Sequence, residues 1–414
     1  MGGVFMMLTG FVSGDWPQFR GATGQGIAEA RDLPLHWSET KNVRWKTPIR
    51  GRAWSSPVVG DGRIWLTTAT EDGKELSVVC LDQESGEILI ERKLFDVEDP
   101  QFAHRFNTYA SPTPVLEGNR VYLTFGSPGI ACIDAETAKV IWQRRDFVCN
   151  HFRGAGASPI LYKDLLILPF DGSDFQFIVG LDKQTGKTIW NTKRSVDYQD
   201  LDPKGNPKED GDWRKAYSTP IISNLSGRDL LISLGSKAVY AYEPETGKEI
   251  WQMVDRKAHS GSVMPFYGGG RLYYCTGFPK GKLNAVKPGG SGEITATHLL
   301  WSVRRNIPNK PSPLFHEGLI FMIDDGGIAS CLDAETGEEI WRERVGGNYS
   351  ASPLLVGDRV YFFSEEGKTA VVKAGREFVV IAENQLDDGF MASPAVVENA
   401  LFLRTKKALY RIQN

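Results

Sequence analysis

Six loops of the chain carry the side chains best suited to hold a ligand. Each loop is polar and aromatic, and each stands directly before a short strand-like run. Arginine guanidinium groups bind carboxylates and phosphates through paired hydrogen bonds, and tyrosine and tryptophan rings stack on flat apolar faces. These residue types therefore favour a site for an anion or a carbohydrate. The candidate ligand-binding residues are His104, Arg105, Asn107, Tyr109, His151, Arg153, Trp213, Arg214, Tyr217, His259, Lys310, Asn348 and Tyr349.

Two other interpretations of these loops stay open. The polar groups could simply hydrate a water-filled channel. Alternatively, His104, His151 and His259 fall at equivalent places in the chain, and three imidazoles can bind a metal ion where they converge. We assign no metal site from the sequence, because equivalent positions of a repeat can lie too far apart to share one ion.

Standard catalytic signatures are absent from the sequence. The chain has no G-x-S-x-G, no H-E-x-x-H, no Walker A loop, no EF-hand loop and no G-x-G-x-x-G. We therefore assign no catalytic residue, and the sequence favours a binding protein over an enzyme.

The composition excludes several classes of protein. The formal net charge is −3 over 414 residues, which gives no basic field for nucleic acid. No apolar run approaches the roughly 20 residues of a membrane-spanning helix. The five cysteines form no C-x-x-C pair, so we expect them to pack in the core rather than to form disulfides or a zinc site.

The start of the chain resembles a shortened export signal. An apolar run, Val4 to Val12, is followed by Ser13-Gly14, although no Lys or Arg precedes it. We expect residues 1–14 to be a truncated signal peptide and the protein to be periplasmic or otherwise exported. If the run is not a signal, the protein is cytoplasmic.

A repeat organises the rest of the chain. A small residue or Met followed by Pro opens an apolar run in eight places, with a mean spacing of about 48 residues. A turn and a second β-rich run follow each one, which predicts a hairpin. This spacing is typical of four-stranded propeller blades. The pairs are Ser56-Pro57, Ser111-Pro112, Ser158-Pro159, Thr219-Pro220, Met264-Pro265, Ser312-Pro313, Ser352-Pro353 and Ser393-Pro394.

A second signature closes most units, with an acidic residue, a small residue and a tryptophan at intervals of four. Asp182, Gly186 and Trp190 are one example. The acid accepts hydrogen bonds from the turn, the glycine supplies a positive φ, and the tryptophan can wedge against the neighbouring blade. The expected docking residues are Trp45, Trp142, Trp190, Trp251, Trp301 and Trp341.

Three units depart from this signature. The first ends in Ile90, the fifth is stretched before Trp301, and the last offers only three strands. The run Val43 to Thr47 carries a tryptophan but follows no turn of its own. We therefore expect it to pair with the C-terminal strands and close the ring, which removes exposed strand edges.

The pattern Asp-x-x-Thr-Gly-x-x-x-Trp resembles the tryptophan-docking repeat of pyrroloquinoline-quinone (PQQ)-like propellers, which include quinoprotein dehydrogenases and BamB-like proteins. The resemblance implies an all-β, eight-bladed β-propeller of four-stranded antiparallel blades, closed by pairing an N-terminal strand with the C-terminal blade. The propeller is expected at 43–414, after an N-terminal extension at 15–42, in a monomer.

The resemblance also bears on cofactors. Quinoprotein dehydrogenases hold PQQ on the propeller axis beneath vicinal cysteines, with a calcium ion bound by acidic and amide side chains. This sequence has no Cys-Cys pair. We therefore expect no cofactor, with PQQ and calcium as the alternative.

The expected function is that of an exported, non-catalytic propeller. Its central funnel and rim would bind a protein, a carbohydrate or another anionic ligand, but neither nucleic acid nor a membrane. The alternative is a quinoprotein-like oxidoreductase. Two inserts, 95–105 and 195–215, could form a lid or a partner surface over the funnel, or could be solvated decoration.

Overall fold

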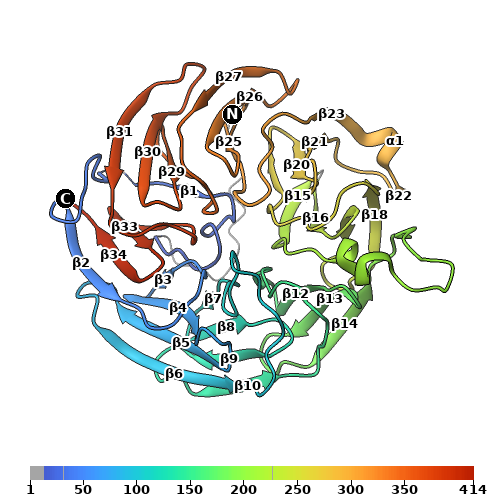
Figure 1. Cartoon of the computed structure of the whole chain (residues 1–414), viewed down its shortest axis with the longest axis horizontal. Coiled ribbons are helices and arrows are strands. Elements are labelled where there is room, and N and C mark those ends of the chain that lie inside the picture. Colours follow the sequence, from blue (N-terminus) through green and yellow to red (C-terminus); the bar gives the residue numbers. More distant parts are fainter. Residues whose placement is uncertain (1–13, 31, 226) are drawn as a thin grey trace.

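Eight sheets surround one axis and form a ring (Figure 1), which confirms the predicted fold class. The computed structural model describes residues 14–30, 32–225 and 227–414. The expected signal peptide lies almost entirely outside these residues. In the part of the chain that the structure describes, no helix is long and apolar enough to cross a membrane.

Each blade contains four antiparallel strands, of which the first lies nearest the axis and the last lies at the outside. Blade 1 contains β3 (Val58–Gly60), β4 (Arg63–Ala69), β5 (Glu75–Asp82) and β6 (Ile88–Asp96). Blade 2 contains β7 (Val115–Glu117), β8 (Arg120–Thr124), β9 (Ile130–Asp134) and β10 (Val140–Arg144). Blade 3 contains β11 (Ile160–Tyr162), β12 (Leu165–Asp171), β13 (Gln176–Asp182) and β14 (Thr188–Lys193). Blade 4 contains β15 (Ile221–Leu225), β16 (Arg228–Leu234), β17 (Ala238–Tyr242) and β18 (Glu249–Val254).

The second half of the chain repeats this plan. Blade 5 contains β19 (Phe266–Gly268), β20 (Arg271–Cys275), β21 (Leu283–Val286) and β23 (Leu299–Val303). Blade 6 contains β24 (Leu314–His316), β25 (Leu319–Ile323), β26 (Ile328–Asp333) and β27 (Glu339–Arg344). Blade 7 contains β28 (Leu354–Val356), β29 (Arg359–Phe363), β30 (Lys368–Lys373) and β31 (Val380–Gln385). Blade 8 contains β32 (Ala395–Val397), β33 (Ala400–Arg404), β34 (Ala408–Ile412) and β2 (Val43–Pro48).

Four short elements lie outside this plan, and one of them, β1 (Ile27–Ala28), belongs to the N-terminal segment described below. The strand β22 (Gly292–Glu293) adds in parallel to β18, so the stretched part of blade 5 covers the outer edge of blade 4. The helix α1 (Thr295–His298) follows β22 directly. A 3-10 segment, Lys208–Arg214, lies in the insert between blades 3 and 4.

The ring closes as the sequence predicted. Strand β2 pairs antiparallel with β34, so the N-terminal strand completes the C-terminal blade (Figure 1). Since every other blade takes its four strands from one stretch of the chain, this is the blade in which the first part of the chain joins the last.

A ladder of side-chain hydrogen bonds links the blades near the axis. In seven places among the described residues, the residue before the strand-opening Pro donates its backbone N–H to the hydroxyl of its counterpart in the next blade, at 2.9–3.0 Å. The bond from Ser393 to Ser56 joins blade 8 to blade 1. Met264 interrupts the ladder because it has no hydroxyl to accept a bond from Thr219.

The strand-opening pair predicted for blade 2 was wrong by two residues. Thr113-Pro114, not Ser111-Pro112, directly precedes β7, and the Thr113 hydroxyl accepts the bond from Ser56 at 2.9 Å. Two such pairs stand side by side in the sequence, and spacing alone does not separate them.

Tryptophans dock each blade against a turn of the next one. The Trp190 indole is buried over Gly247 and donates its N–H to the carbonyl of Pro244 at 3.1 Å. Trp45, Trp142 and Trp301 lie in the same way over Gly86, Gly186 and Gly337. Trp341 donates to the carbonyl of Gly375, and Trp251 is buried beside β22.

Where blade 1 lacks this tryptophan, its neighbour lacks the glycine. Ile90 pairs with Cys80 at the position where Trp142 pairs with Cys132 in blade 2. The turn that it faces carries Ala138, at φ 53°, in place of glycine, and both residues belong to one apolar cluster. The smaller Ile90 leaves room for the alanine Cβ, so the two departures compensate for each other.

Blade 7 also lacks a docking tryptophan, and the N-terminal extension supplies one. Ala382 occupies the register position, and Trp37 packs in the same cluster, stacked on Tyr361 with ring centroids 6.4 Å apart. The side chain of Asn384 accepts from the backbone N–H of Trp37 at 2.8 Å and donates to the carbonyl of Leu35 at 3.1 Å.

The segment 14–28, which we call the strap, crosses the propeller on the side away from the loops that precede the first strands. Trp16 pairs with Val59, and the carbonyl of Pro17 accepts from Leu116 at 2.8 Å. At its end, β1 (Ile27–Ala28) adds in parallel to β28. The strap thus bridges blades 1, 2 and 7.

Candidate functional site

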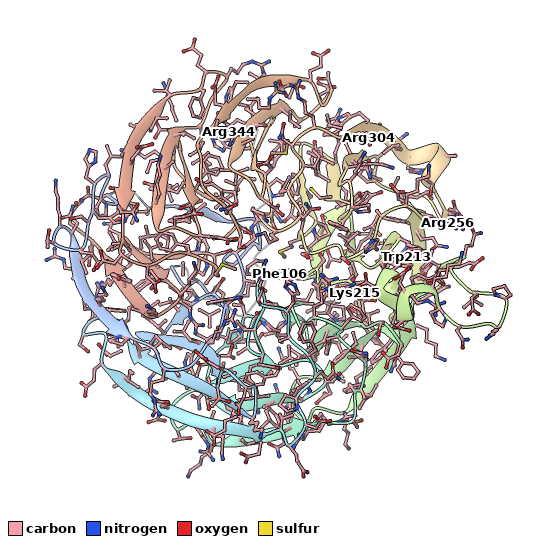
Figure 2. All side chains as sticks on the ribbon, in the orientation of Figure 1. Phe106, Trp213, Lys215, Arg256, Arg304 and Arg344 are labelled. Carbon is pink, nitrogen blue, oxygen red and sulfur yellow. The ribbon has the colours of Figure 1, made fainter. Side chains whose placement is uncertain are left out.

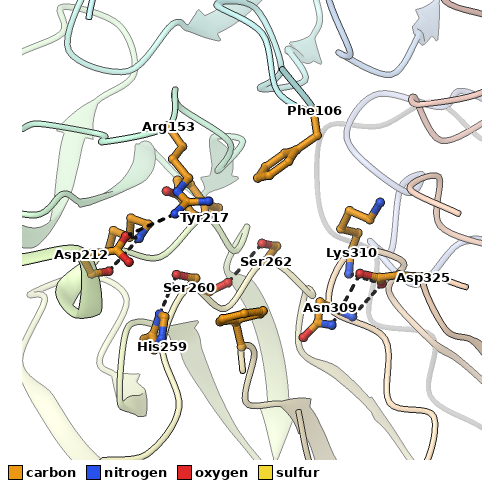
Figure 3. A pocket seen from close by; sticks show the side chains of 12 residues that line it. Phe106, Arg153, Asp212, Tyr217, His259, Ser260, Ser262, Asn309, Lys310 and Asp325 are labelled. Carbon is orange, nitrogen blue, oxygen red and sulfur yellow. Dashed lines mark hydrogen bonds and ion pairs between the residues drawn. The ribbon is translucent and has the colours of Figure 1, made fainter. Parts of the chain in front are cut away.

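A cavity of about 350 Å³ opens on the face of the ring that carries the loops before each first strand; we call it the main cavity. Figure 3 shows Arg153 and Phe106 on one side of it and His259, Ser260 and Asn309 on the other. Its lining comes from seven segments between strands. The lining residues are Phe106, Arg153, Asp212, Lys215, Tyr217, His259, Ser260, Ser262, Phe278, Asn309, Lys310 and Asp325.

Two cations on one wall share a single carboxylate. Lys215 is buried, pairs with the Asp212 carboxylate and donates to the Asp212 carbonyl at 2.8 Å. Arg153 lies 3.9 Å from the same carboxylate and remains 35% exposed. Burial, together with the positive charge of Arg153, lowers the pKa of Lys215 to about 7. The wall therefore carries more positive than negative charge.

The opposite wall carries a third cation. Lys310 pairs with Glu365 at 2.8 Å and keeps a third of its side chain exposed. Asp325 accepts the backbone N–H groups of Asn309 and Lys310, at 2.9 and 3.2 Å, which holds this loop in place. Burial raises the pKa of Asp325.

Aromatic rings complete the main cavity. Phe106 is exposed, and Phe278 meets the His259 ring edge-on with centroids 5.6 Å apart. The Tyr217 hydroxyl donates to the carbonyl of His151 at 3.2 Å, which leaves its ring face along the wall. Burial and nearby cations lower the pKa of His259 to about 4, so its imidazole is neutral at pH 7.

Four of the sequence-predicted ligand residues line the main cavity: Arg153, Tyr217, His259 and Lys310. Asn107 lies beside it, in a central channel of about 170 Å³. Arg105 lines a further cavity of about 490 Å³ on the same face, which we call the side cavity.

Other predicted ligand residues lie inside the protein. Tyr109 packs under Gly73 in a core cluster, and Tyr349 is fully buried. His151 is buried, and its Nε2 accepts the backbone N–H of Ser127 at 2.9 Å. These side chains hold the loops together instead of facing the main cavity.

The remaining predicted residues do not line the main cavity and instead contact neighbouring side chains. His104 lies 4.0 Å from Phe106, measured between ring centroids. Trp213 lies beside Lys237, and Arg214 pairs with Asp200, its Nε lying 3.0 Å from a carboxylate oxygen. Asn348 donates its side-chain amide to Glu366 at 2.8 Å.

Eight lining residues were not among the sequence-predicted ligand residues: Phe106, Asp212, Lys215, Ser260, Ser262, Phe278, Asn309 and Asp325. Of these, Phe278 and Asp325 lie in loops that the sequence analysis did not consider. Both follow the second strand of their blade, Asp325 between β25 and β26 and Phe278 between β20 and β21. Because neighbouring strands are antiparallel, these loops emerge on the same face as the loops before the first strands. Counting the strands of each repeat would therefore have placed these loops on the same face as the other predicted loops.

The donor set does not fit a quinoprotein calcium site. Among the residues that the structure describes, no three His, Cys, Asp or Glu side chains are grouped to hold a metal ion. The two acids of the main cavity are already engaged, Asp212 with Lys215 and Asp325 with the loop backbone. His104, His151 and His259 likewise form no such group.

A buried thiol and imidazole lie close together, but burial makes them unreactive. The Cys149 sulfur lies 3.7 Å from the ring nitrogens of His151. Burial raises the pKa of Cys149 to about 12 and lowers that of His151 to about 4, so both groups are neutral at pH 7. This pair therefore provides no activated nucleophile, and neither residue lines the main cavity.

Two comparisons of the sequence with known proteins find related chains. A family profile described as outer membrane protein assembly factor BamB matches residues 27–145, 73–204 and 292–411. Tetrathionate hydrolase of Acidithiobacillus ferrooxidans is 22% identical over 60% of this chain, and quinohemoprotein alcohol dehydrogenase ADH IIB of Pseudomonas putida is 23% identical over 78%. The chain covers 48% of each, so it spans about half the length of these curated relatives.

Solved structures share the fold. The quinohemoprotein alcohol dehydrogenase of Comamonas testosteroni matches with a TM-score of 0.67 at 12% identity, over 99% of this chain and 82% of that one. BamB of Moraxella catarrhalis matches with a TM-score of 0.58 at 13% identity, over 89% of this chain and 99% of that one. At these identities the likeness concerns the fold alone.

Proposed function

Since the chain belongs to the PQQ-like propeller family whose profile is described as outer membrane protein assembly factor BamB, we propose that it is a non-catalytic propeller that binds an anionic group of a protein or carbohydrate partner. The group enters the main cavity. Arg153 and Lys310 provide the positive charge, and Phe106 and Tyr217 provide apolar faces.

One observation carries this proposal. Arg153 and Lys310, basic side chains from two different loops, line one cavity in a protein whose net charge is −3. Arg153 and Lys310 are each about one-third exposed, so their remaining donors can reach a ligand. A carboxylate or sulfate placed between them would gain charge-assisted hydrogen bonds, which are stronger than neutral ones.

The test is binding of small anions to the full chain by calorimetry, with D-galacturonate and sulfate as probes. We expect the double variant Arg153→Gln/Lys310→Met to weaken binding at least about tenfold, which is 1.4 kcal/mol. The matched control is Arg304→Gln/Arg344→Gln, whose side chains are exposed and lie away from Phe106 (Figure 2). Equal weakening by both double variants, or no binding of either anion, would rule the proposal out.

A second function, that of a quinoprotein-like oxidoreductase, draws support from the relation to the quinohemoprotein alcohol dehydrogenase ADH IIB. The residues present do not fit its calcium ion, so we derive no redox step. Purified protein mixed with PQQ and calcium should carry no absorbing chromophore after gel filtration. A stoichiometric chromophore would favour the oxidoreductase over the binding protein.

We also propose that the protein is exported and monomeric. The family description names an outer membrane assembly factor, which supports the first part. Fractionation of cells would place the protein outside the cytoplasm, and light scattering would give the mass of one chain.

A further inference from the structure

We propose that the loop face binds a linear oligosaccharide of uronic acids, one end in the main cavity and the rest along the central channel mouth into the side cavity. This inference rests on the proposed function and names its ligand. Phe106 lines all three spaces. Arg153 and Lys310 line both the main cavity and the channel, and Trp54 and Met391 line both the channel and the side cavity. The three spaces are therefore neighbours on one face, and we propose that a ligand follows them as one groove.

The whole groove is basic. The side cavity adds four cations, Arg52, Arg105, Lys406 and Lys407, against two acids, Glu71 and Glu365. One of these acids is already committed, because the Glu365 carboxylate binds Lys310 at 2.8 Å and also accepts from Ser350. A ligand that follows the groove thus meets positive charge along its length, and a single anion would use only part of it.

Aromatic side chains alternate with these charges. The Arg52 guanidinium lies 5.4 Å over the Trp54 ring, and the Trp54 indole donates to the carbonyl of Phe106 at 3.1 Å, which ties the two ring-bearing loops together. Phe106 is 47% exposed, although an apolar ring of this size is normally buried. It stands where the three spaces meet, so it can present a face to a ligand passing between them.

Uronic acids match this combination better than an acidic peptide does. Each uronate ring carries a carboxylate for an arginine or lysine and an apolar ring face for a tryptophan or phenylalanine. Its hydroxyl groups can bond to the serine-rich lining of the channel, which includes Ser111, Ser262 and Ser350. An acidic peptide supplies the carboxylates but lacks the ring faces.

The experiment compares galacturonate oligomers of two and six residues by calorimetry on the full chain. We expect the six-residue oligomer to bind at least about tenfold more tightly than the two-residue one. The side-cavity variant Arg105→Gln/Lys407→Gln, at two exposed residues, should remove this gain, so that it binds the two oligomers with similar affinity. The main-cavity variant Arg153→Gln/Lys310→Met should weaken both oligomers.

Two controls make the result decisive. Neutral cellohexaose should not bind, and poly-L-glutamate should bind more weakly than the galacturonate hexamer. Equal affinity for the short and long oligomers, or tighter binding of poly-L-glutamate, would overturn the inference. If the short oligomer still depends on Arg153 and Lys310 in that case, the proposed function stands without it; if neither oligomer binds, both fail.

Discussion

At the scale of single residues, the molecule is held together by pairs in which one blade gives a tryptophan and the next gives a glycine. Gly247 shows two reasons why glycine is needed at such a turn. Its φ is 67°, and an added Cβ would collide with the Trp190 ring. The same logic explains Ile90 and Ala138, where a smaller side chain permits a Cβ. The sequence predicted the tryptophans but not this compensation, because it does not say which turn faces which ring.

This pairing can be measured at Trp190 and Gly247. Trp190→Ala should lower the free energy of unfolding by about 3–5 kcal/mol, since it empties a buried site. Gly247→Ala should cost about 2 kcal/mol or more alone, but only about 1 kcal/mol in the Trp190→Ala background, where the positive φ alone remains. Urea unfolding of the four proteins gives the coupling, and strictly additive costs would contradict the contact.

His151 should make stability depend on pH. Burial lowers its pKa to about 4, below the value of about 6.5 expected in the unfolded chain, and its Nε2 already accepts a hydrogen bond. The folded state thus binds fewer protons than the unfolded state between these values. Its contribution, at most about 3 kcal/mol, is complete above pH 6.5 and is lost as the pH falls toward 4.

The comparison is with His151→Gln, which keeps an acceptor but does not titrate in this range. The difference in unfolding free energy between this variant and the original chain should change between pH 7.5 and pH 5. The control, His36→Gln, changes an exposed histidine and should show no such change. A constant difference for His151→Gln would contradict the burial of its neutral form.

At the scale of elements, the serine or threonine before seven of the eight first strands does two things. It starts the strand beside a proline, and its hydroxyl accepts a backbone N–H from the preceding blade, as Ser352 does for Ser312 at 3.0 Å. The repeat was visible in the sequence because both tasks constrain the same two positions. In blade 2 the repeat predicted the start of the first strand two residues too early, because a second pair, Ser111-Pro112, satisfies the pattern without opening a strand.

Two buried serines distinguish the effect of the interblade hydrogen bond from the effect of burial alone. Ser352→Ala leaves the buried N–H of Ser312 without its acceptor and should cost about 1–3 kcal/mol of unfolding free energy. Ser223 is equally buried, but its hydroxyl has no partner among the described residues. Ser223→Ala should therefore change stability by less than about 0.5 kcal/mol. Similar costs for the two variants would show that the interblade bond contributes nothing.

The loops show why the site was only partly predictable. Loops before the first strands were recognised by the repeat, and they supplied Arg153, Tyr217 and Lys310. The loops after the second strands vary in length and carry no signature, so Phe278 and Asp325 were missed. Which side chains turn inward, as Tyr349 does, depends on packing that the pattern of one sequence does not record.

At the scale of the whole molecule, closure depends on the N-terminal residues in two ways. Strand β2 completes blade 8, and Trp37 fills the interface that Ala382 leaves empty in blade 7. The first closure was predicted from a missing strand. The second was not, because nothing in the sequence links Trp37 to a residue about 345 positions away.

Trp37→Ala should therefore loosen the seam between blades 7 and 8. We expect a loss of about 3–5 kcal/mol in unfolding free energy, with amide exchange rising first in β31 and β2. Trp213→Ala is the control, because Trp213 is only half-buried in the insert. Equal effects of the two variants, or exchange that rises evenly around the ring, would argue against this role for Trp37.

The strap leaves the loop face as the side from which a ligand approaches the central channel. Phe19 lines the base of the central channel while Trp16, Pro17 and β1 hold the segment against three blades. The proposed uronic acid oligosaccharide would therefore lie across the loop face and leave from that same face. Binding would not need a free chain end, so one long polysaccharide could bind several propellers along its length.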